Sequence, residues 1–374
     1  MADFDALSLD DLRRRRSAKW SLVEPDVLPM WVAELDVPLA PAVADVLQRA
    51  LADGDTGYAS PAVLAPAFAG FAARRWGWAV DVGRCWPVAD VMVGVGEALR
   101  LLTGPGDGVV VCPPVYHPFF SVPVEHERVV VQVPLAADGA LDLPGIDRAL
   151  AGGARAVLLS SPHNPTGRVW TAAELQALDD VVSAHGAVVV SDEIHAPLTL
   201  SGATFTPYLA GGDRSAVAVV SASKAFNLAG LKAALLVAGS PAVAERLASV
   251  PEDVAYRCGH LGGLASVAAW ESGDDWLDAL LVHLDRNRRL LAELLPDGVG
   301  YAPPQASYLA WLDLRSSGLA APAAHLLERG RVALVEGSDF GAPGEGFARL
   351  NLGTTRAVLE EGVRRVRSAL PSGS

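Results

Sequence analysis

VVSASKAFNLAGLKAAL, residues 219–235, ends an apolar run with Ser-Ala-Ser and then places Lys224 at once. A run of this kind, rich in valine, favours a buried strand. Lysine is normally a surface residue, because burial of an ammonium group is costly. Lys224 at the tip of this strand therefore either caps a loop or is held uncharged for chemistry.

The composition is that of a globular protein. The chain has 374 residues, of which 51% are hydrophobic and 20% are charged, so it can bury a large core in about two to three domain-sized units. It has 30 Lys and Arg against 43 Asp and Glu, a net charge of −13. This charge repels nucleic acids and anionic membranes, and we expect neither as a partner.

The three cysteines, Cys85, Cys112 and Cys258, are far apart and odd in number. Their spacing builds neither a disulfide framework nor a metal site, so we expect reduced thiols and no bound metal. The first residues lack the apolar segment of a signal peptide, and no apolar run is long enough to span a membrane. We therefore expect a cytoplasmic protein.

The middle of the chain alternates short β-branched runs with helical patterns. Strands are predicted around residues 109–111 and 129–133, and in ARAVLLSSP, GAVVVSDE and SAVAVVSAS. TAAELQALDDVVSAHG, between the third and fourth runs, reads as a helix with a capping box from Thr171 to Glu174 and a terminator at Gly186. A strand, a helix and a strand in about 35 residues form a βαβ unit, so the sheet is largely parallel.

The last third of the chain has a different pattern. DDWLDALLVHLDRNRRLLAELL predicts a long amphipathic helix, ASYLAWLDL a strand, and TTRAVLEEGVRRVRSAL a closing helix capped by Thr354 or Thr355. We expect an α/β protein with a large domain, residues 46–285, and a smaller α+β domain, residues 286–374. An N-terminal segment, residues 1–45, is expected to join the small domain.

Polar side chains follow successive strands of this sheet. Tyr116 follows the first strand, Asn164 the third, and Asp192 with His195 the fourth, while Lys224 follows the fifth. Each alone is more often structural: a packed loop aromatic, a turn residue, a helix cap. Because ligands bind beyond the carboxyl ends of parallel strands, such residues at four strand ends favour a shared site.

Pyridoxal phosphate has the groups that such a set binds. Its aldehyde takes a lysine whose amine is neutral, and its ring nitrogen needs a buried carboxylate. Its phenolic oxygen needs a donor such as asparagine, and its face an aromatic ring. For the phosphate, VMVGVGEALRLL predicts a glycine-rich turn that opens a helix, with the amides of Val95 and Gly96 directed at the anion. Ser221 and Lys232 would add a hydroxyl and a charge.

The order of these motifs resembles a known superfamily. GVGEAL, PPVYHPFF, SSPHNPTG, SDEIH, SASKAFNLAGLK and RLNLG are similar to motifs of the aminotransferase-type, fold type I, pyridoxal phosphate enzymes. AKW, LPMWVAELDV, GYASP, DEIHAPL and ASYLAWLDLR resemble the bacterial cystathionine β-lyase-like C–S lyases within it. The resemblance covers residues 18–366 and implies that fold, with a mostly parallel sheet between helices.

The resemblance implies a role for each residue at the strand ends. Lys224 would condense with the cofactor aldehyde and act as the general acid and base. Asp192 would bind the pyridine nitrogen, Asn164 the phenolic oxygen, and Tyr116 would stack on the ring.

The resemblance also implies how the phosphate is held. Val95, Gly96 and Ser221 would bind it in the same subunit. Tyr58, in GYASP, would reach the phosphate of the partner subunit, which implies a homodimer with shared active sites. Lys232 stands where many aminotransferases have an arginine, and a solvated helix lysine is an equal alternative for it.

The substrate would be held by its α-carboxylate. The resemblance implies that Arg349 clamps this group by a bidentate pair, with Ala33 and Asn164 beside it. His195 would lie near the phenolic oxygen, where many aminotransferases have tyrosine. Trp31 is expected to pack in the core.

Two enzymatic functions share these residues. The resemblance favours a β-lyase that cleaves cystathionine or a related cysteine S-conjugate to pyruvate, ammonia and a thiol. An aminotransferase acting on an amino acid and a keto acid is the alternative. A non-catalytic regulator that binds the cofactor is a minor third, disfavoured because Lys224 and Asp192 are both present.

Overall fold

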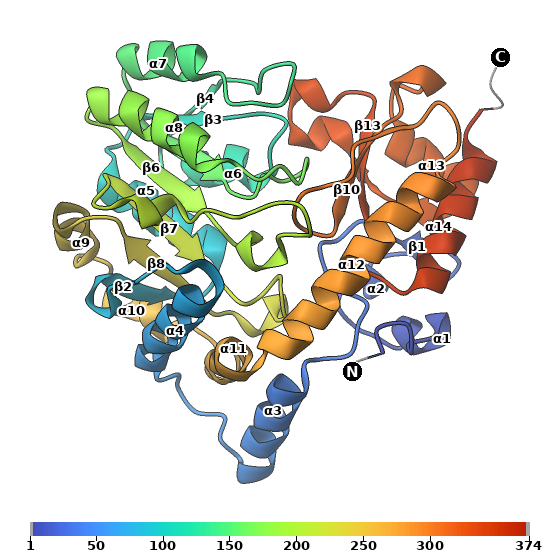
Figure 1. Ribbon diagram of the computed structural model, residues 1–374, viewed down its shortest axis with the longest axis horizontal. Helices are drawn as coiled ribbons and strands as arrows, with labels where there is room; N and C mark the ends of the chain where they lie inside the picture. Colours follow the sequence, from blue (N-terminus) through green and yellow to red (C-terminus); the bar gives the residue numbers. More distant parts are fainter. Residues whose placement is uncertain (1–2, 372–374) are drawn as a thin grey trace.

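The computed structural model describes residues 3–371. Its centre is a seven-stranded sheet in which only β8 runs antiparallel to its neighbours, so the predicted mostly parallel sheet is confirmed (Figure 1). The strands, in spatial order, are β2 (Cys85–Val88), β8 (Ala234–Ala238), β7 (Ala216–Val220), β6 (Val188–Asp192), β5 (Ala154–Ser160), β3 (Gly108–Val111) and β4 (Val129–Gln132).

Both faces of this sheet are covered by helices, which explains the continuous apolar runs. Alternate residues of β5 enter different clusters: Leu158 packs with one layer of helices and Val157 with the other. The layer beside Leu158 contains α5 (Val91–Leu102), α6 (Pro118–Glu125), α9 (Pro241–Leu247) and α10 (Glu252–Tyr256). The layer beside Val157 contains α7 (Leu143–Ala151), α8 (Ala172–Ala184), α4 (Leu64–Trp76) and α11 (His260–Ser272).

Helix α8 forms where the sequence predicts it. The Thr171 hydroxyl accepts a hydrogen bond from the Glu174 amide (3.2 Å), and the Glu174 carboxylate accepts one from the Thr171 amide (2.8 Å). Gly186 follows the helix with a φ of +60°, a conformation that glycine adopts without strain. The capping box and the terminator are therefore both confirmed.

The C-terminal part forms a second, antiparallel sheet. Its strands are β12 (Val335–Glu336), β13 (Phe347–Asn351), β10 (Leu309–Asp313) and β9 (Gly300–Tyr301), and it is flanked by α12 (Asp274–Leu294), α13 (Pro322–Gly330) and α14 (Arg356–Ala369). Thr355 caps α14 through its hydroxyl. The predicted domain boundary at residues 285–286 falls inside α12, and the division into domains stays a prediction.

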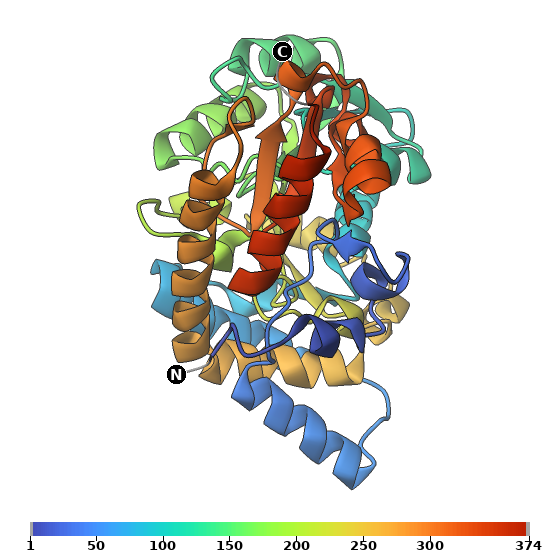
Figure 2. The same cartoon turned by 90° about the vertical axis from the view of Figure 1, so that its right-hand side faces the viewer.

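Residues 3–53 lie in two places. The segment with α1 (Leu9–Arg13) and α2 (Ala18–Ser21) ends in β1 (Leu28–Pro29), which pairs in parallel with β11 (Val332–Ala333). Helix α3 (Pro41–Asp53) packs on α11 and then extends below the body of the molecule (Figures 1 and 2).

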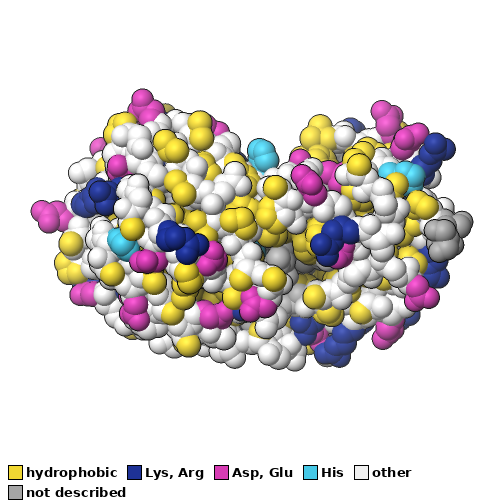
Figure 3. Space-filling view, turned by 90° about the horizontal axis from the view of Figure 1, so that it is seen from above, with side chains coloured by type: hydrophobic (Ala, Val, Ile, Leu, Met, Phe, Trp, Pro, Cys, Tyr) yellow, Lys and Arg dark blue, Asp and Glu magenta, His cyan; other side chains and the backbone are white. Residues whose placement is uncertain are grey.

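The surface seen in Figure 3 is hollowed between two raised parts, and acidic and basic side chains are interspersed over it. Within residues 3–371, every helix is too short or too polar to cross a lipid bilayer.

Helix α5 overturns one expectation. Residues 91–93 are its first turn, not a segment before a glycine-rich turn, and the Asp90 carboxylate caps it by accepting from the Val93 amide (2.9 Å). The glycines of GVGEAL therefore lie inside the helix. A Cβ on Gly94 would come within 2.9 Å of Val219 Cγ1 and 3.1 Å of Leu236 Cδ2, so Gly94 allows α5 to lie close against the sheet.

Gly94→Ala tests this packing role. The added methyl group overpacks the contact with β7 and β8, and we expect a loss of about 1–3 kcal/mol in the free energy of unfolding. Gly70→Ala in α4 is the matched control, because its Cβ would meet only the flexible Arg74 side chain at 3.4 Å. We expect this control to be neutral or to gain up to about 1 kcal/mol from helix propensity. Urea unfolding measures both, and equal effects would contradict the close contact.

Candidate active site

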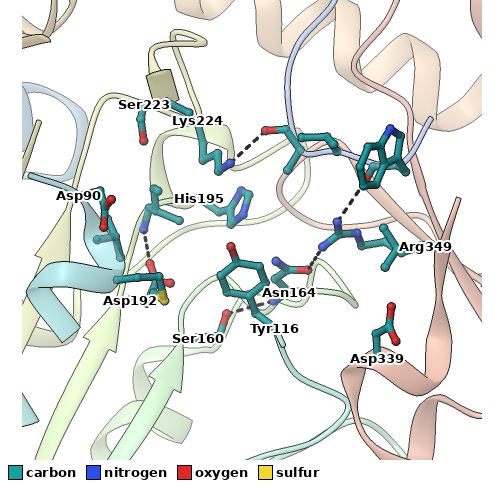
Figure 4. Close-up of a pocket in the computed structure, with 18 of the residues that line it drawn as sticks. Asp90, Tyr116, Ser160, Asn164, Asp192, His195, Ser223, Lys224, Asp339 and Arg349 are labelled. Carbon is teal, nitrogen blue, oxygen red and sulfur yellow. Dashed lines mark hydrogen bonds between the residues drawn. The ribbon is translucent and has the colours of Figure 1, made fainter. Parts of the chain in front are cut away.

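One cavity of about 680 Å³ lies beyond the carboxyl ends of β5, β6 and β7. The side chains expected from four strand ends all line it, together with residues from the antiparallel sheet and the N-terminal segment (Figure 4). Of the residues that the sequence singled out, the cavity is lined by Ala33, Tyr116, Asn164, Asp192, His195, Ser221, Lys224, Lys232 and Arg349.

Lys224 follows β7, and its side chain is half-buried. Its Nζ donates a hydrogen bond to the carbonyl of Ala33 (3.0 Å). Burial, with a further contribution from the positive charge of Arg349, lowers the pKa of Lys224 to about 8. Because an amine with this pKa is partly neutral near pH 7, Lys224 is prepared to act as a nucleophile and as a base.

Asp192 is the last residue of β6 and lies at the base of the cavity. Burial raises its pKa to about 7, although its Oδ1 accepts a hydrogen bond from the Ile194 amide (3.1 Å) and Lys224 favours its charged form. A buried carboxylate of this kind is stabilised by a bound group that brings a positive charge or a proton.

Arg349, on β13, faces the strand ends from the other side of the cavity. Its Nη1 donates to the Asn164 side-chain oxygen (3.0 Å) and its Nη2 to the carbonyl of Trp31 (3.2 Å). Its Nε is buried without a hydrogen-bond partner among residues 3–371. Arg349 therefore keeps donor capacity for an anion that enters the cavity.

Asn164 and Tyr116 are held together by the backbone. The Tyr116 amide donates to the Asn164 carbonyl (3.1 Å), and the Asn164 amide donates to the Ser160 hydroxyl (3.1 Å). Because Arg349 occupies the side-chain oxygen of Asn164, the side-chain NH₂ of Asn164 remains available to donate to a ligand.

His195 is a neutral side chain in this site. Burial, together with the positive charges of Lys224 and Arg349, lowers its pKa to about 3. Its Nδ1 lies 3.1 Å from the Ser307 hydroxyl, which fixes the orientation of the ring. His195 therefore contacts the cavity without adding charge.

The start of α5, not its second turn, faces the cavity where the sequence predicted an anion. Val95 and Gly96 are buried in the second turn of α5, where helix hydrogen bonds use their amides, so their predicted role is wrong. The residues at the start of the helix, Val91 and Met92, line the cavity instead. Asp90 is a helix-capping residue before an apolar run, and this signal was sufficient to predict the start of α5.

Lys232 lies at the same end of the cavity, and its Nζ is 2.9 Å from the Asp90 carboxylate. It has a φ of +60°, and its carbonyl accepts from the Gly259 amide (2.7 Å). A Cβ on Gly259 or Gly262 would come within 2.1 Å of the Leu231 carbonyl oxygen. These glycines of the GHLGG motif therefore allow the close packing that places Lys232 here.

Other residues differ from the sequence expectation. Ser221 lines the cavity but donates its hydroxyl to the Ala233 carbonyl (2.7 Å), and Ser223, to which no role was assigned, lines it as well. Trp31 lines the cavity rather than packing in the core, and Asp339 was missed because only the antiparallel sheet brings it near. Tyr58 is 88% exposed and lies outside the cavity of its own chain.

The residues present fit pyridoxal phosphate group by group. Lys224 offers a partly neutral amine for the aldehyde, and Asp192 offers a buried carboxylate for the protonated ring nitrogen. Asn164 would donate to the phenolic oxygen, and Tyr116 would contact the ring. The start of α5 and Lys232 offer amides and a positive charge for the phosphate.

Comparison with known proteins agrees with this fit. The model of the family "Aminotransferase class I and II" matches residues 27–366 of the chain. The chain belongs to this family. The sequence-based recognition of the aminotransferase fold type I superfamily is therefore confirmed.

Individual members of the aminotransferase family resemble the chain over its whole length. A putative cystathionine beta-lyase of Mycobacterium leprae is 46% identical, with 98% of each chain covered. Cystathionine beta-lyase PatB of Bacillus subtilis is 36% identical over 92% of this chain and 93% of its own. The crystal structure of a putative PLP-dependent beta-cystathionase from Corynebacterium diphtheriae superimposes with a TM-score of 0.94, at 32% identity and full coverage of both chains.

Asp192→Asn should stabilise the cofactor-free protein. Because the folded pKa is about 7 and the ordinary value is 3.8, the folded state binds more protons between these values, and stability falls as pH rises through this window. A shift of about three units corresponds to about 4 kcal/mol, an upper limit. We expect the variant to unfold at higher urea concentration than the parent at pH 8, and at a similar concentration at pH 4.

Asp90→Asn is the control for this experiment. Burial raises the pKa of Asp90, but the Val93 amide and Lys232 outweigh burial and lower it. Its charged form therefore stabilises the fold above the ordinary pKa, and the control should lose stability at pH 8. If Asp192→Asn is also less stable than the parent at pH 8, burial of the charged Asp192 carboxylate does not destabilise the fold as predicted.

Proposed function

We propose that this protein is a pyridoxal phosphate-dependent C–S β-lyase. The supporting observation is a single cavity in which the partly neutral amine of Lys224 faces the buried carboxylate of Asp192 and the guanidinium of Arg349. Similarity over nearly the whole chain to proteins named cystathionine beta-lyase supports lyase chemistry in particular. The substrate would be cystathionine or another cysteine S-conjugate.

The cofactor, when bound, supplies a ring that accepts the electron pair left on the substrate Cα. Lys224, as a free base with a pKa of about 8, would remove the Cα proton. Asp192 would keep the proton on the ring nitrogen, because its negative charge is stabilised only by such a partner in this buried position. Lys224, once protonated in this way, would also be the acid for the departing sulfur.

The substrate is oriented by its α-carboxylate in this proposal. Arg349 would bind it with the donors that Asn164 and Trp31 leave free, and Ala33 would lie beside it. The overall reaction consumes one water: the C–S bond breaks, the thiol leaves with a proton, and the remaining three carbons become pyruvate and ammonium.

The alternative is an aminotransferase, as the name of the family indicates. The same residues would serve, and Lys224 would give back the proton it removes without loss of a group from the substrate Cβ. A non-catalytic regulator fits the site less well, because Lys224 and Asp192 both have the environments that catalysis needs.

Release of pyruvate distinguishes the two enzymatic functions. With purified protein and L-cystathionine, we expect pyruvate and a free thiol in equal amounts without any added keto acid. Lys224→Ala should abolish both products while the protein stays folded. Turnover that appears only when 2-oxoglutarate or pyruvate is supplied would instead establish the aminotransferase. Pyruvate is followed with lactate dehydrogenase and the thiol with a chromogenic reagent.

We further propose a homodimer with shared active sites. Tyr58 stands on an exposed loop between α3 and α4, where its ring packs edge-on to that of Tyr256. Leu51 and Val63 on the same region are also exposed, and α3 extends away from the body (Figure 2). A second copy of the chain that covers this region would bury these apolar side chains. Tyr58 of the first copy would then lie at the active site of the second copy. The cytoplasmic location stays a prediction from the sequence.

Subunit mixing tests the shared site. Tyr58→Ala and Lys224→Ala should each be strongly impaired alone. In a mixed dimer, one of the two sites combines an intact Lys224 with an intact Tyr58 from the partner. When equal amounts of the two variants are dissociated and reassociated, about half of the dimers are mixed, and each mixed dimer has one complete site of its two. The mixture should therefore recover up to about one quarter of the parental activity. No recovery, with mixed dimers demonstrated by differently tagged subunits, would contradict a shared site.

A further inference from the structure

Residues 31–36 form a strap without helix or strand structure, and its first three residues line the cavity. Each of its first five carbonyls accepts a hydrogen bond from a side chain elsewhere in the chain. The donors are Arg349 to Trp31, Asn351 to Val32, Lys224 and Tyr308 to Ala33, Lys19 and Asn351 to Glu34, and Arg15 and Asn227 to Leu35.

Two of these carbonyls hold the cations of the site. Trp31 accepts from Arg349 Nη2 (3.2 Å), and Ala33 accepts from Lys224 Nζ (3.0 Å). Figure 4 shows both hydrogen bonds as dashed lines, one from Lys224 and one from Arg349. The position of the strap therefore fixes the substrate-binding guanidinium and the amine at the same time.

The strap is anchored at its far end by a buried ion pair. Lys19 Nζ lies 2.6 Å from Asp36 Oδ2, and both side chains are 1% exposed. The other carboxylate oxygen accepts from the Trp20 indole (2.9 Å), and the Asp36 amide donates to the Gly353 carbonyl (2.8 Å). Buried pairs add little net stability, because desolvation offsets their attraction. The contribution of this ion pair is instead to fix the position of the strap at Asp36.

The opposite side of the strap is tied to the lysine loop. The Asn227 side chain accepts from the Leu35 amide (2.9 Å) and donates to the Leu35 carbonyl (3.0 Å). Asn227 is three residues after Lys224 and has a φ of +60°. A displacement of the strap at Asp36 would therefore be transmitted to Leu35 and to the loop that carries the amine.

We infer that Lys19 and Asp36 are positioning residues, whose ion pair holds the strap where the carbonyls of Trp31 and Ala33 orient Arg349 and Lys224. This role explains the AKW and ELD motifs, neither of which supplies a side chain to the reacting groups. The inference rests on the proposed function for its kinetic readout, while its binding readout needs only the bound cofactor.

The experiment compares three variants in the cofactor-loaded protein. Lys19→Met removes the nearer cation and leaves the buried Asp36 carboxylate with only Arg15 Nη1, at 3.9 Å, as a charged partner. This variant therefore loses stability as well as position. Lys19→Met/Asp36→Leu replaces the pair by apolar side chains of similar volume, which typically restores stability. Trp20→Phe removes one hydrogen bond to Asp36 and is the mild variant if Lys19→Met does not fold.

Binding of L-alanine is the first readout, because alanine has the α-carboxylate but no leaving group. It is measured from the change in near-visible absorbance of the bound cofactor. Loss of the orienting bond to Arg349 should weaken alanine binding about five- to tenfold in Lys19→Met and in the double variant, which corresponds to about 1–1.4 kcal/mol. Trp20→Phe should show a smaller loss in the same direction.

Turnover is the second readout. We expect kcat to fall and KM to rise together for an S-conjugate, because the amine and the guanidinium are both displaced. Arg288→Met is the matched control: it removes a mostly buried cation that contacts Asp285, Pro304 and Ser201 but not the strap. It should lower thermal stability and leave alanine binding unchanged.

The double variant decides the outcome. If it regains stability and remains weak in alanine binding, the pair positions the strap. If alanine binding returns to the parental value with stability, or if Arg288→Met weakens binding equally, the pair is only structural and the inference is overturned. Absence of pyruvate from every protein, with normal alanine binding in the parent, would count against the lyase proposal alone.

Discussion

The site depends on the burial of an amine and a carboxylate in one cavity. Burial moves both pKa values towards neutrality: that of Lys224 falls to about 8 and that of Asp192 rises to about 7. The fold therefore bears the cost of two poorly solvated groups that do not form an ion pair with each other. A bound molecule with an aldehyde and a basic ring nitrogen relieves both, so the same strain that lowers stability without the cofactor provides affinity for it.

Two different sheets supply the side chains that line opposite sides of the cavity. The parallel strands deliver Asn164, Asp192 and Lys224 at one edge, because their carboxyl ends coincide. The antiparallel sheet delivers Arg349, which Asn164 orients through a direct hydrogen bond. The groups expected to bind the cofactor and the group expected to bind the substrate thus come from separate parts of the chain, and the strap bonds to both.

The sequence predicted the residues whose position follows from a simple rule. Asn164, Asp192 and Lys224 were found because parallel strand ends share an edge, and Thr171 because a capping box is local. The predicted phosphate-binding role of Val95 and Gly96 was wrong because the glycine-rich motif was assigned to anion binding. In the structure Gly94 allows close packing against β7, and Gly96 lies in the second turn of α5. The carbonyl contacts of the strap had no sequence signal, since any residue supplies a carbonyl and only tertiary structure determines its partner.

The position of the Lys224 amine also bears on which reaction the site favours. Elimination and transamination would begin with the same proton removal by Lys224, and they differ in whether the departing sulfur is the next atom to receive a proton. In the structure the amine is directed to the Ala33 carbonyl, on the side of the cavity that holds Trp31 and Arg349. A tether on this side keeps the amine near the substrate carboxylate and its side chain. In the proposed lyase, the strap would therefore act on the selectivity of the site as well as on its rate, although no strap side chain would take part in bond making.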